Sequence, residues 1–193
     1  MNIFYLDRNY EAAAQMHVDK HVVKMPLEVA QMACTVVTLD HLGIEASDRF
    51  ITKDELAQMR EFAASQRSLS QEERFVPYLP VMPNHPCTIW MRSSYQNYAW
   101  AVNYALALEK EYTYRYGKPS LKACDVIRSL PTPYFKWTKF TQPAQAMPDQ
   151  YKCNDSVEAY RKYYIGDKAY IGSWKRRGAP TWWPKELQGA TQG

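Results

Sequence analysis

The sequence contains only four cysteines, and none of them stands in the CxxC spacing that zinc knuckles use. Cys34, Cys87, Cys124 and Cys153 lie far apart in a chain of 193 residues, so no disulfide framework is implied either. An HExxH motif is also missing. We therefore expect reduced, partly buried thiols, no metal site and no cofactor.

The sequence also lacks a segment with the charged start and apolar run of a signal peptide, and no apolar run is predicted to span a membrane. A cytoplasmic protein without membrane contact is expected. Clear strands, internal repeats and long linkers are missing as well, which predicts an all-α fold. The length suits one domain with a sizeable core.

Aromatic residues, in contrast, are abundant, with 15 Tyr and 6 Trp. Such side chains suit interfaces and base stacking, although an aromatic core would explain them equally well. The net charge of +4 is a mild bias toward anionic partners and falls short of a nucleic-acid signature. Most of the positive excess lies between Lys136 and Arg177.

Start and stop signals predict five helices. The first begins at Asn9, which can cap it, and runs to about Leu39, with Pro26 kinking or dividing it. A capping box at Thr52 and a left-handed cap at Gly117 mark two of the other boundaries. The remaining helices are expected over 53–67, 87–116, 120–129 and 155–175.

Two proline-rich segments, 75–86 and 131–151, are expected to be irregular loops. Residues 1–184 are predicted to form one compact helical domain, and 185–193 a flexible tail. A monomer is expected.

A narrow polar stripe marks the first expected helix. At about 100° per residue, its members fall on one line with apolar residues on both sides: His17, Lys20, His21, Lys24, Glu28 and Gln31. Because a surface helix has a wider polar face, the pattern predicts a largely buried helix whose polar line faces a cleft. Two His and two Lys favour an anionic ligand and proton transfer. The alternative is a partly solvated stripe with a Lys24–Glu28 pair.

The spacing of His17 and His21 would also suit a helical metal pair, with His85 or Glu28 as a third ligand. Lysines on the same face would repel a divalent cation, so no metal is expected.

Two further segments are candidate phosphate contacts. Asn84 and His85 precede a helix start, where backbone amides favour phosphate, and Arg92 could line the same cleft. The alternative is that Asn84 caps and His85 packs. Later, residues 160–184 interleave basic and aromatic side chains, which predicts phosphate contacts and base stacking by Arg161, Lys162, Lys175, Arg176, Arg177, Trp182 and Trp183. The alternative is a tail that its tryptophans pin to the body of the protein.

The order of these elements resembles the pyrimidine-dimer DNA glycosylases of the phage endonuclease V type and their bacterial relatives. The family carries a helical His and, two turns on, an acid followed by Leu-Pro; EAAAQMHVDKHVVKMPLEV matches this at His17 and Pro26. NHPCTIW matches the Asn-His-Pro element of the bacterial relatives, and APTWWP matches a Pro-Thr-Trp segment. The chain is also similar to uncharacterised tailed-phage proteins with HVxKHVVKM and NHPxxxW elements. The resemblance covers most of the chain as an order of elements and implies an endonuclease V-like fold.

In that family the amine of an N-terminal Thr attacks the sugar C1′ to form a Schiff base, and a helix carboxylate assists ring opening and elimination. The present chain begins Met-Asn, and Lys24 stands where the family has its acid. Lys24 could supply the amine instead, with His17 or His21 moving protons and Glu28 replacing the carboxylate. The fold could also carry out another base-modifying reaction, or bind without chemistry.

These observations predict a phage-type DNA-base-processing protein, glycosylase/lyase being the first class to test, with DNA or a nucleotide as partner. Its catalytic residues are expected to be Lys24, His17, His21 and Glu28. The alternative is a non-catalytic nucleotide- or nucleic-acid-binding phage factor that acts as an inhibitor or sensor.

Overall fold

The computed structural model describes residues 1–187 and confirms the all-α class: no strand occurs in this part of the chain. Its α-helices are α1 (Tyr10–Met16), α2 (Asp19–His41), α3 (Lys53–Gln66), α4 (Pro86–Ser93), α5 (Tyr95–Tyr116), α6 (Lys122–Ser129) and α7 (Ser156–Asp167). Short 3-10 helices are η1 (Asp149–Tyr151), η2 (Ala169–Ile171) and η3 (Lys185–Leu187). Residues 188–193, most of the predicted tail, lie outside the described residues.

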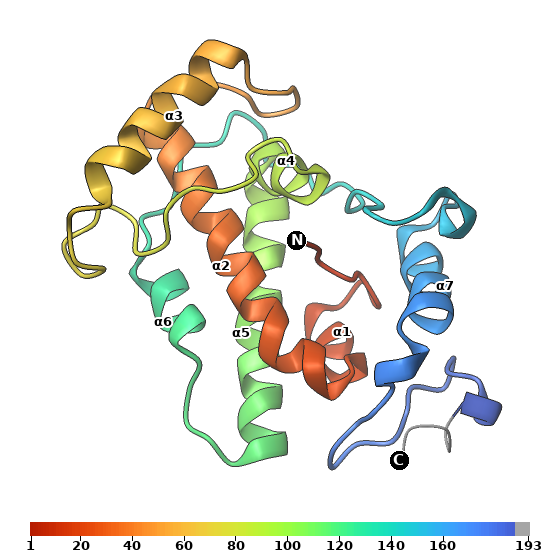
Figure 1. Cartoon of the computed structure of the whole chain (residues 1–193). Coiled ribbons are helices and arrows are strands. Elements are labelled where there is room, and N and C mark those ends of the chain that lie inside the picture. The colour runs from red at the N-terminus through yellow and green to blue at the C-terminus, as the bar shows by residue number, and fades with distance from the viewer. Residues whose placement is uncertain (188–193) are drawn as a thin grey trace.

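The two longest helices, α2 and α5, pack against each other at the centre, and α1, α4 and α6 surround them (Figure 1). The first residues of the chain run between α2 and α7 (Figure 1). Phe4 joins these two helices, because its ring stacks on His21 of α2 at 4.5 Å and on Tyr163 of α7 at 5.9 Å. The start of the chain is therefore an internal part of the fold.

The expected helix caps are present. The Asn9 side chain accepts hydrogen bonds from two backbone amides of α1, and Thr52 with Glu55 forms the predicted capping box of α3. Asp155 caps α7. Gly117, with φ of +68°, closes α5 in the left-handed conformation that glycine adopts without strain.

Three predicted boundaries are wrong. The first helix does not divide at Pro26, which lies inside the continuous helix α2, but at His17 and Val18, whose backbones are extended. The long helix expected over 87–116 is broken at Ser94, also extended, whose side chain then caps α5. The last helix ends at Asp167 rather than Lys175.

Buried contacts explain the first of these differences. Proline inside a helix costs about 3 kcal/mol, but most of the side chains of α2 are buried, and this burial offsets the cost. At the true break, the carbonyls of Gln15 and His17 accept hydrogen bonds from the buried Arg115 guanidinium. These partners replace the helical hydrogen bonds that the break removes.

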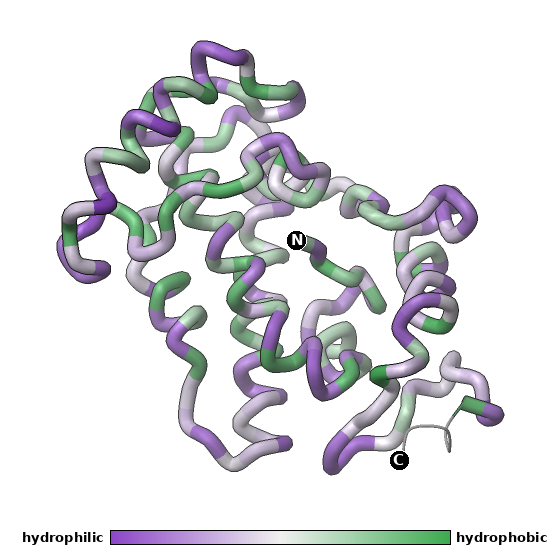
Figure 2. Tube along the Cα trace, in the orientation of Figure 1, coloured by the Kyte–Doolittle hydropathy of each residue, from purple (hydrophilic) through white to green (hydrophobic). Residues whose placement is uncertain are grey.

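Apolar residues of all the central helices form one main core, and most of the residues of α2 are buried. Figure 2 shows hydrophobic residues recurring along α2. Contrary to the sequence-based expectation, α2 is long and apolar enough to cross a membrane. However, 78% of its most apolar window is buried inside the fold, as in the core helix of a soluble protein. No other helix within residues 1–187 meets these criteria.

A second, smaller cluster holds α3 at the edge of the molecule. Its buried residues are Leu39, Ile44, Ala46, Ile51 and Met59. Figure 1 shows α3 projecting away from α5, α6 and α7. At its start, Glu55 pairs with Arg49 at 2.6 Å, and further along the helix Met59 and Ala63 are buried.

Candidate functional site

The chain start lies against the carboxylate of Glu28 on α2. The backbone nitrogen of Asn2 donates a hydrogen bond to Glu28 Oε2 at 2.8 Å, and the Met1 amine lies 3.9 Å from the same oxygen. On the other side, Lys24 Nζ is 2.9 Å from Glu28 Oε1. The Glu28 side chain is 12% exposed and that of Lys24 is 62% exposed. We call these four residues the amine–carboxylate site: one largely buried carboxylate between two amines.

The Asn2 side chain holds the chain start in place. Asn2 Oδ1 accepts hydrogen bonds from the amides of Ile3 and Phe4, and Asn2 Nδ2 donates to the carbonyl of Ala146 at 2.9 Å. Phe4 adopts a φ of +47°, a conformation that a residue with a Cβ takes only under constraint from its surroundings. The irregular segment 131–151 therefore contributes directly to positioning the site.

His85 stands next to this site, at the start of α4. Its Nδ1 accepts a hydrogen bond from the amide of Cys87 at 3.1 Å, so His85 caps the helix itself while Asn84 does not. Burial and the nearby positive chain start lower the pKa of His85, and Glu28 partly opposes that shift. His85 is accordingly neutral near pH 7 and presents an Nε2–H donor.

The two predicted proton carriers, His17 and His21, point into the core and do not line a cleft with Lys24. His17 Nδ1 lies 2.6 Å from the carbonyl of Ala13, which can only accept, so His17 Nε2 accepts from the Tyr104 hydroxyl. His21 Nδ1 pairs with the Tyr164 hydroxyl at 2.6 Å. Burial lowers the pKa of each histidine to about 3. Both are therefore neutral, structural groups at physiological pH.

This burial makes the stability of the protein depend on pH. Between its ordinary pKa of 6.5 and its folded value of about 3, His21 binds a proton only in the unfolded chain. The free energy of unfolding should therefore fall as the pH is lowered through this range. Replacing His21 with Phe is expected to reduce the slope of the unfolding free energy against pH by about 1.4 kcal/mol per pH unit. Urea unfolding at several pH values measures this slope. His41→Gln, a change at an exposed histidine, is the control, and an equal effect of both variants would contradict the prediction.

Two of the expected phosphate contacts serve the fold instead. The Asn84 amide group pairs with the backbone of Ile51, accepting at 2.8 Å and donating at 3.4 Å. Arg92 is buried, and its guanidinium donates to the carbonyls of three residues, Ala46, Arg49 and Pro83. Arg92 thus fastens the segment before α3 to α4 and is not free to bind a phosphate.

The basic and aromatic segment near the C-terminus is mostly engaged with the body of the protein. Among its cations, Arg161 binds Asp7 and the Leu6 carbonyl, while Lys162 pairs with Glu158 at 2.7 Å. Further along, Arg177 forms two hydrogen bonds with Glu111, both at 3.0 Å.

The neighbouring side chains are held in a similar way. Arg176 donates to the Tyr114 carbonyl, and the Lys175 ammonium lies over the ring of Tyr116 at 5.1 Å. Trp183 is 2% exposed and belongs to the main core, whereas Trp182 is half-buried beside Met16. These contacts favour the pinned-tail interpretation. Lys20 differs, because it is exposed and makes no ion pair within the described part of the chain.

Sequence reasoning missed Asn2, whose backbone nitrogen makes the closest contact of the chain start to Glu28. The only signal for it was the family resemblance, in which an N-terminal amine does the chemistry. Tyr104 and Tyr164, the partners of the buried histidines, were also missed, since they lie 87 and 143 residues away in sequence. Nothing local in the sequence identifies such pairs.

The chain matches no family model, no curated protein and no solved structure. Within residues 1–187, no three His, Cys, Asp or Glu side chains gather closely enough to hold a metal ion.

Proposed function

We propose that this protein is a phage-type DNA glycosylase/lyase of endonuclease V-like fold that acts through an amine at the amine–carboxylate site. One observation carries the proposal: the largely buried Glu28 carboxylate lies between the chain start and the Lys24 amine. An amine nucleophile beside a carboxylate that can accept a proton is the group pair that imine-forming base excision requires.

In the proposed reaction, a neutral amine attacks the sugar C1′, and the bond from C1′ to the base breaks as the base leaves with a proton. Opening of the sugar ring gives the imine. Glu28 then removes a proton from C2′, and the bond between C3′ and its phosphate oxygen breaks. The imine is the covalent, reducible intermediate, and the elimination that follows it cleaves the strand.

The chain-terminal amine is the better of the two candidate nucleophiles. Terminal amines as a class lose their proton nearer neutrality than lysine side chains do. Lys24, paired with Glu28 and mostly exposed, would then attract the DNA backbone. This assignment departs from the sequence-based interpretation in which Lys24 supplies the nucleophile and the histidines move protons.

Removal of Met1 would improve this geometry. The Asn2 nitrogen would become the terminal amine, and it already lies 2.8 Å from Glu28 Oε2, whereas the Met1 amine lies 3.9 Å away.

Borohydride trapping on a duplex with an abasic site tests the proposal. We expect a covalent adduct that peptide mapping assigns to the first residue of the chain. Lys24→Ala should keep the adduct, while a Gly-Ser extension before Met1 should abolish it, and the same extension at the C-terminus serves as the control. Absence of an adduct with the unmodified protein, on abasic and on damaged duplexes, would overturn the glycosylase/lyase proposal. Loss of the adduct in Lys24→Ala alone would move the nucleophile to Lys24.

The second candidate is a non-catalytic factor that binds a nucleotide or nucleic acid. It is favoured by the exposed cations Lys20 and Lys24 on the face of α2 where the related enzymes carry their acid. Such a protein would bind DNA in a salt-dependent manner, leave it intact and give no adduct.

A further inference from the structure

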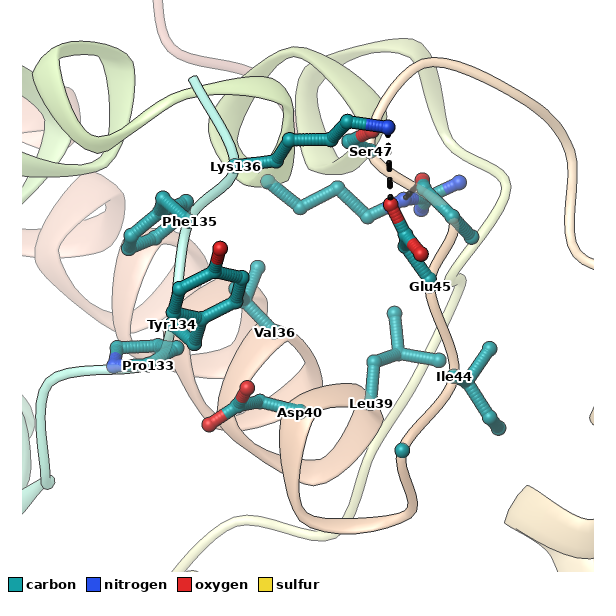
Figure 3. Close-up of a pocket in the computed structure, with 13 residues that line it drawn as sticks. Val36, Leu39, Asp40, Ile44, Glu45, Ser47, Pro133, Tyr134, Phe135 and Lys136 are labelled. Atoms are coloured by element: carbon teal, nitrogen blue, oxygen red, sulfur yellow. Dashed lines mark hydrogen bonds and ion pairs between the residues drawn. The ribbon is translucent and has the colours of Figure 1, made fainter. Parts of the chain in front are cut away.

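A separate cavity of about 190 Å³ lies at the far end of α2 (Figure 3). Val36 and Leu39 from α2 and Ile44 from the loop that carries Glu45 are apolar residues of its lining. On one side stand Pro133, Tyr134 and Phe135, and across the opening stands Glu45, whose carboxylate faces Lys136 at 3.5 Å (Figure 3). Val36 follows Glu28 by eight residues, which is about 12 Å along the helix axis, so this is a different site from the amine–carboxylate site.

Hydrogen bonds and a ring contact anchor both walls of this cavity. The wall that carries Glu45 is fixed by the buried Arg92, which donates to the Ala46 carbonyl. The opposite wall is fixed where Phe135 packs on Tyr98, with ring centroids 5.3 Å apart, and where the Trp137 carbonyl accepts from the Tyr95 amide. A preformed cavity loses little entropy on binding, which is typical of small-molecule sites.

The opening combines groups that suit a neutral planar heterocycle. Asp40 and Glu45 contribute two negative charges and Arg92 and Lys136 two positive ones, so the formal charge of the lining cancels. The Tyr134 ring is 81% exposed, which leaves an aromatic face free for stacking. A strongly charged ligand such as a free phosphate is disfavoured, because Glu45 balances the charge of Lys136 and the Arg92 guanidinium is bonded to carbonyls.

We propose that this cavity binds a guanine base, stacked on Tyr134, with Glu45 accepting its ring N–H and amino groups and Lys136 donating to its carbonyl oxygen. The hydrogen-bonding edge of guanine presents one acceptor beside two donors, which matches an ammonium beside a carboxylate. Adenine and cytosine present an acceptor where the carboxylate needs a donor. This guanine site rests on the proposed function, to which it adds a place where a base is recognised. Guanine binding itself requires none of the chemistry proposed at the amine–carboxylate site.

Calorimetric titration of the full chain with guanosine, inosine and adenosine tests the proposal. Guanosine should bind, inosine should bind several-fold more weakly because it lacks the amino group, and adenosine should bind at least about tenfold more weakly. Glu45→Gln and Tyr134→Ala should each weaken guanosine binding about tenfold. Glu61→Gln, a change at an exposed carboxylate of α3 outside the cavity, should have no effect.

Several results would overturn the guanine site: no binding at millimolar guanosine, equal binding of guanosine and adenosine, or unchanged binding in Glu45→Gln. An oligothymidine containing one guanine distinguishes the source of the base: tighter binding than guanosine indicates a base within single-stranded DNA, and equal binding a free nucleoside. Circular dichroism of each variant checks folding. Borohydride trapping tests the glycosylase/lyase proposal on an abasic duplex with the cavity unaltered, whereas nucleoside titration tests only the guanine site. Either experiment can therefore fail while the other succeeds.

Discussion

Glu28→Gln is expected to slow strand cleavage at an abasic site by about 10²- to 10⁴-fold in single-turnover assays. The glutamine amide cannot accept the proton that leaves C2′, so the elimination step loses its base. The fold should persist, because the glutamine carbonyl oxygen can still accept the hydrogen bond from the Asn2 amide. The loss should therefore fall on the chemical step and leave thermal unfolding nearly unchanged.

Two matched variants make this expectation specific. Glu28→Asp keeps a carboxylate at a shorter reach and should restore part of the rate, and Glu61→Gln should cleave like the unmodified protein. If Glu28→Gln cleaves within a few-fold of the unmodified protein, another group is the base and the role assigned to Glu28 is incorrect.

Arg115→Met is expected to give the largest loss of stability, about 3–5 kcal/mol in the free energy of unfolding. Arg115 is fully buried, donates to Glu111 at 2.7 Å and Asp19 at 2.8 Å, and also binds the carbonyls at the α1–α2 break. Methionine fills similar space but leaves those carbonyls without partners. Urea unfolding followed by circular dichroism measures the effect.

The control is Arg8→Met, which removes an exposed ion pair with Asp155. Exposed pairs contribute little, so the loss should be under about 1 kcal/mol. Equal losses in the two variants would show that the buried guanidinium does not hold the α1–α2 break to α5.

Features encoded within one turn of helix were predictable from the sequence. The capping box at Thr52 fixed the start of α3, and Gly117 fixed the end of α5, because each acts on the backbone immediately beside it. The two breaks were missed for the opposite reason. At the first break, the carbonyl of His17 accepts a hydrogen bond from Arg115, which is 98 residues away. At Ser94, the helical pattern of the sequence continues across the break and hides it.

The candidate site shows the same limit. The helical period predicted that His17 and His21 lie on one line with Lys24. A helical period holds only within one helix, however, and His17 precedes the start of α2. Glu28 was identified as a replacement carboxylate, and the structure places it beside the chain start. Its partner Asn2 depends on a contact with Ala146 across the whole chain, which no local pattern encodes.

The small cluster under α3 is a second core, separate from the main one. Amides of α2 and α5 lie in the main core and should exchange with solvent only through global unfolding, whereas α3 can open alone at lower cost. All 6 tryptophans lie outside residues 41–85, which contain α3. Tryptophan fluorescence therefore reports on the main core and not on α3. An apparently two-state fluorescence transition would therefore be silent about the melting of α3.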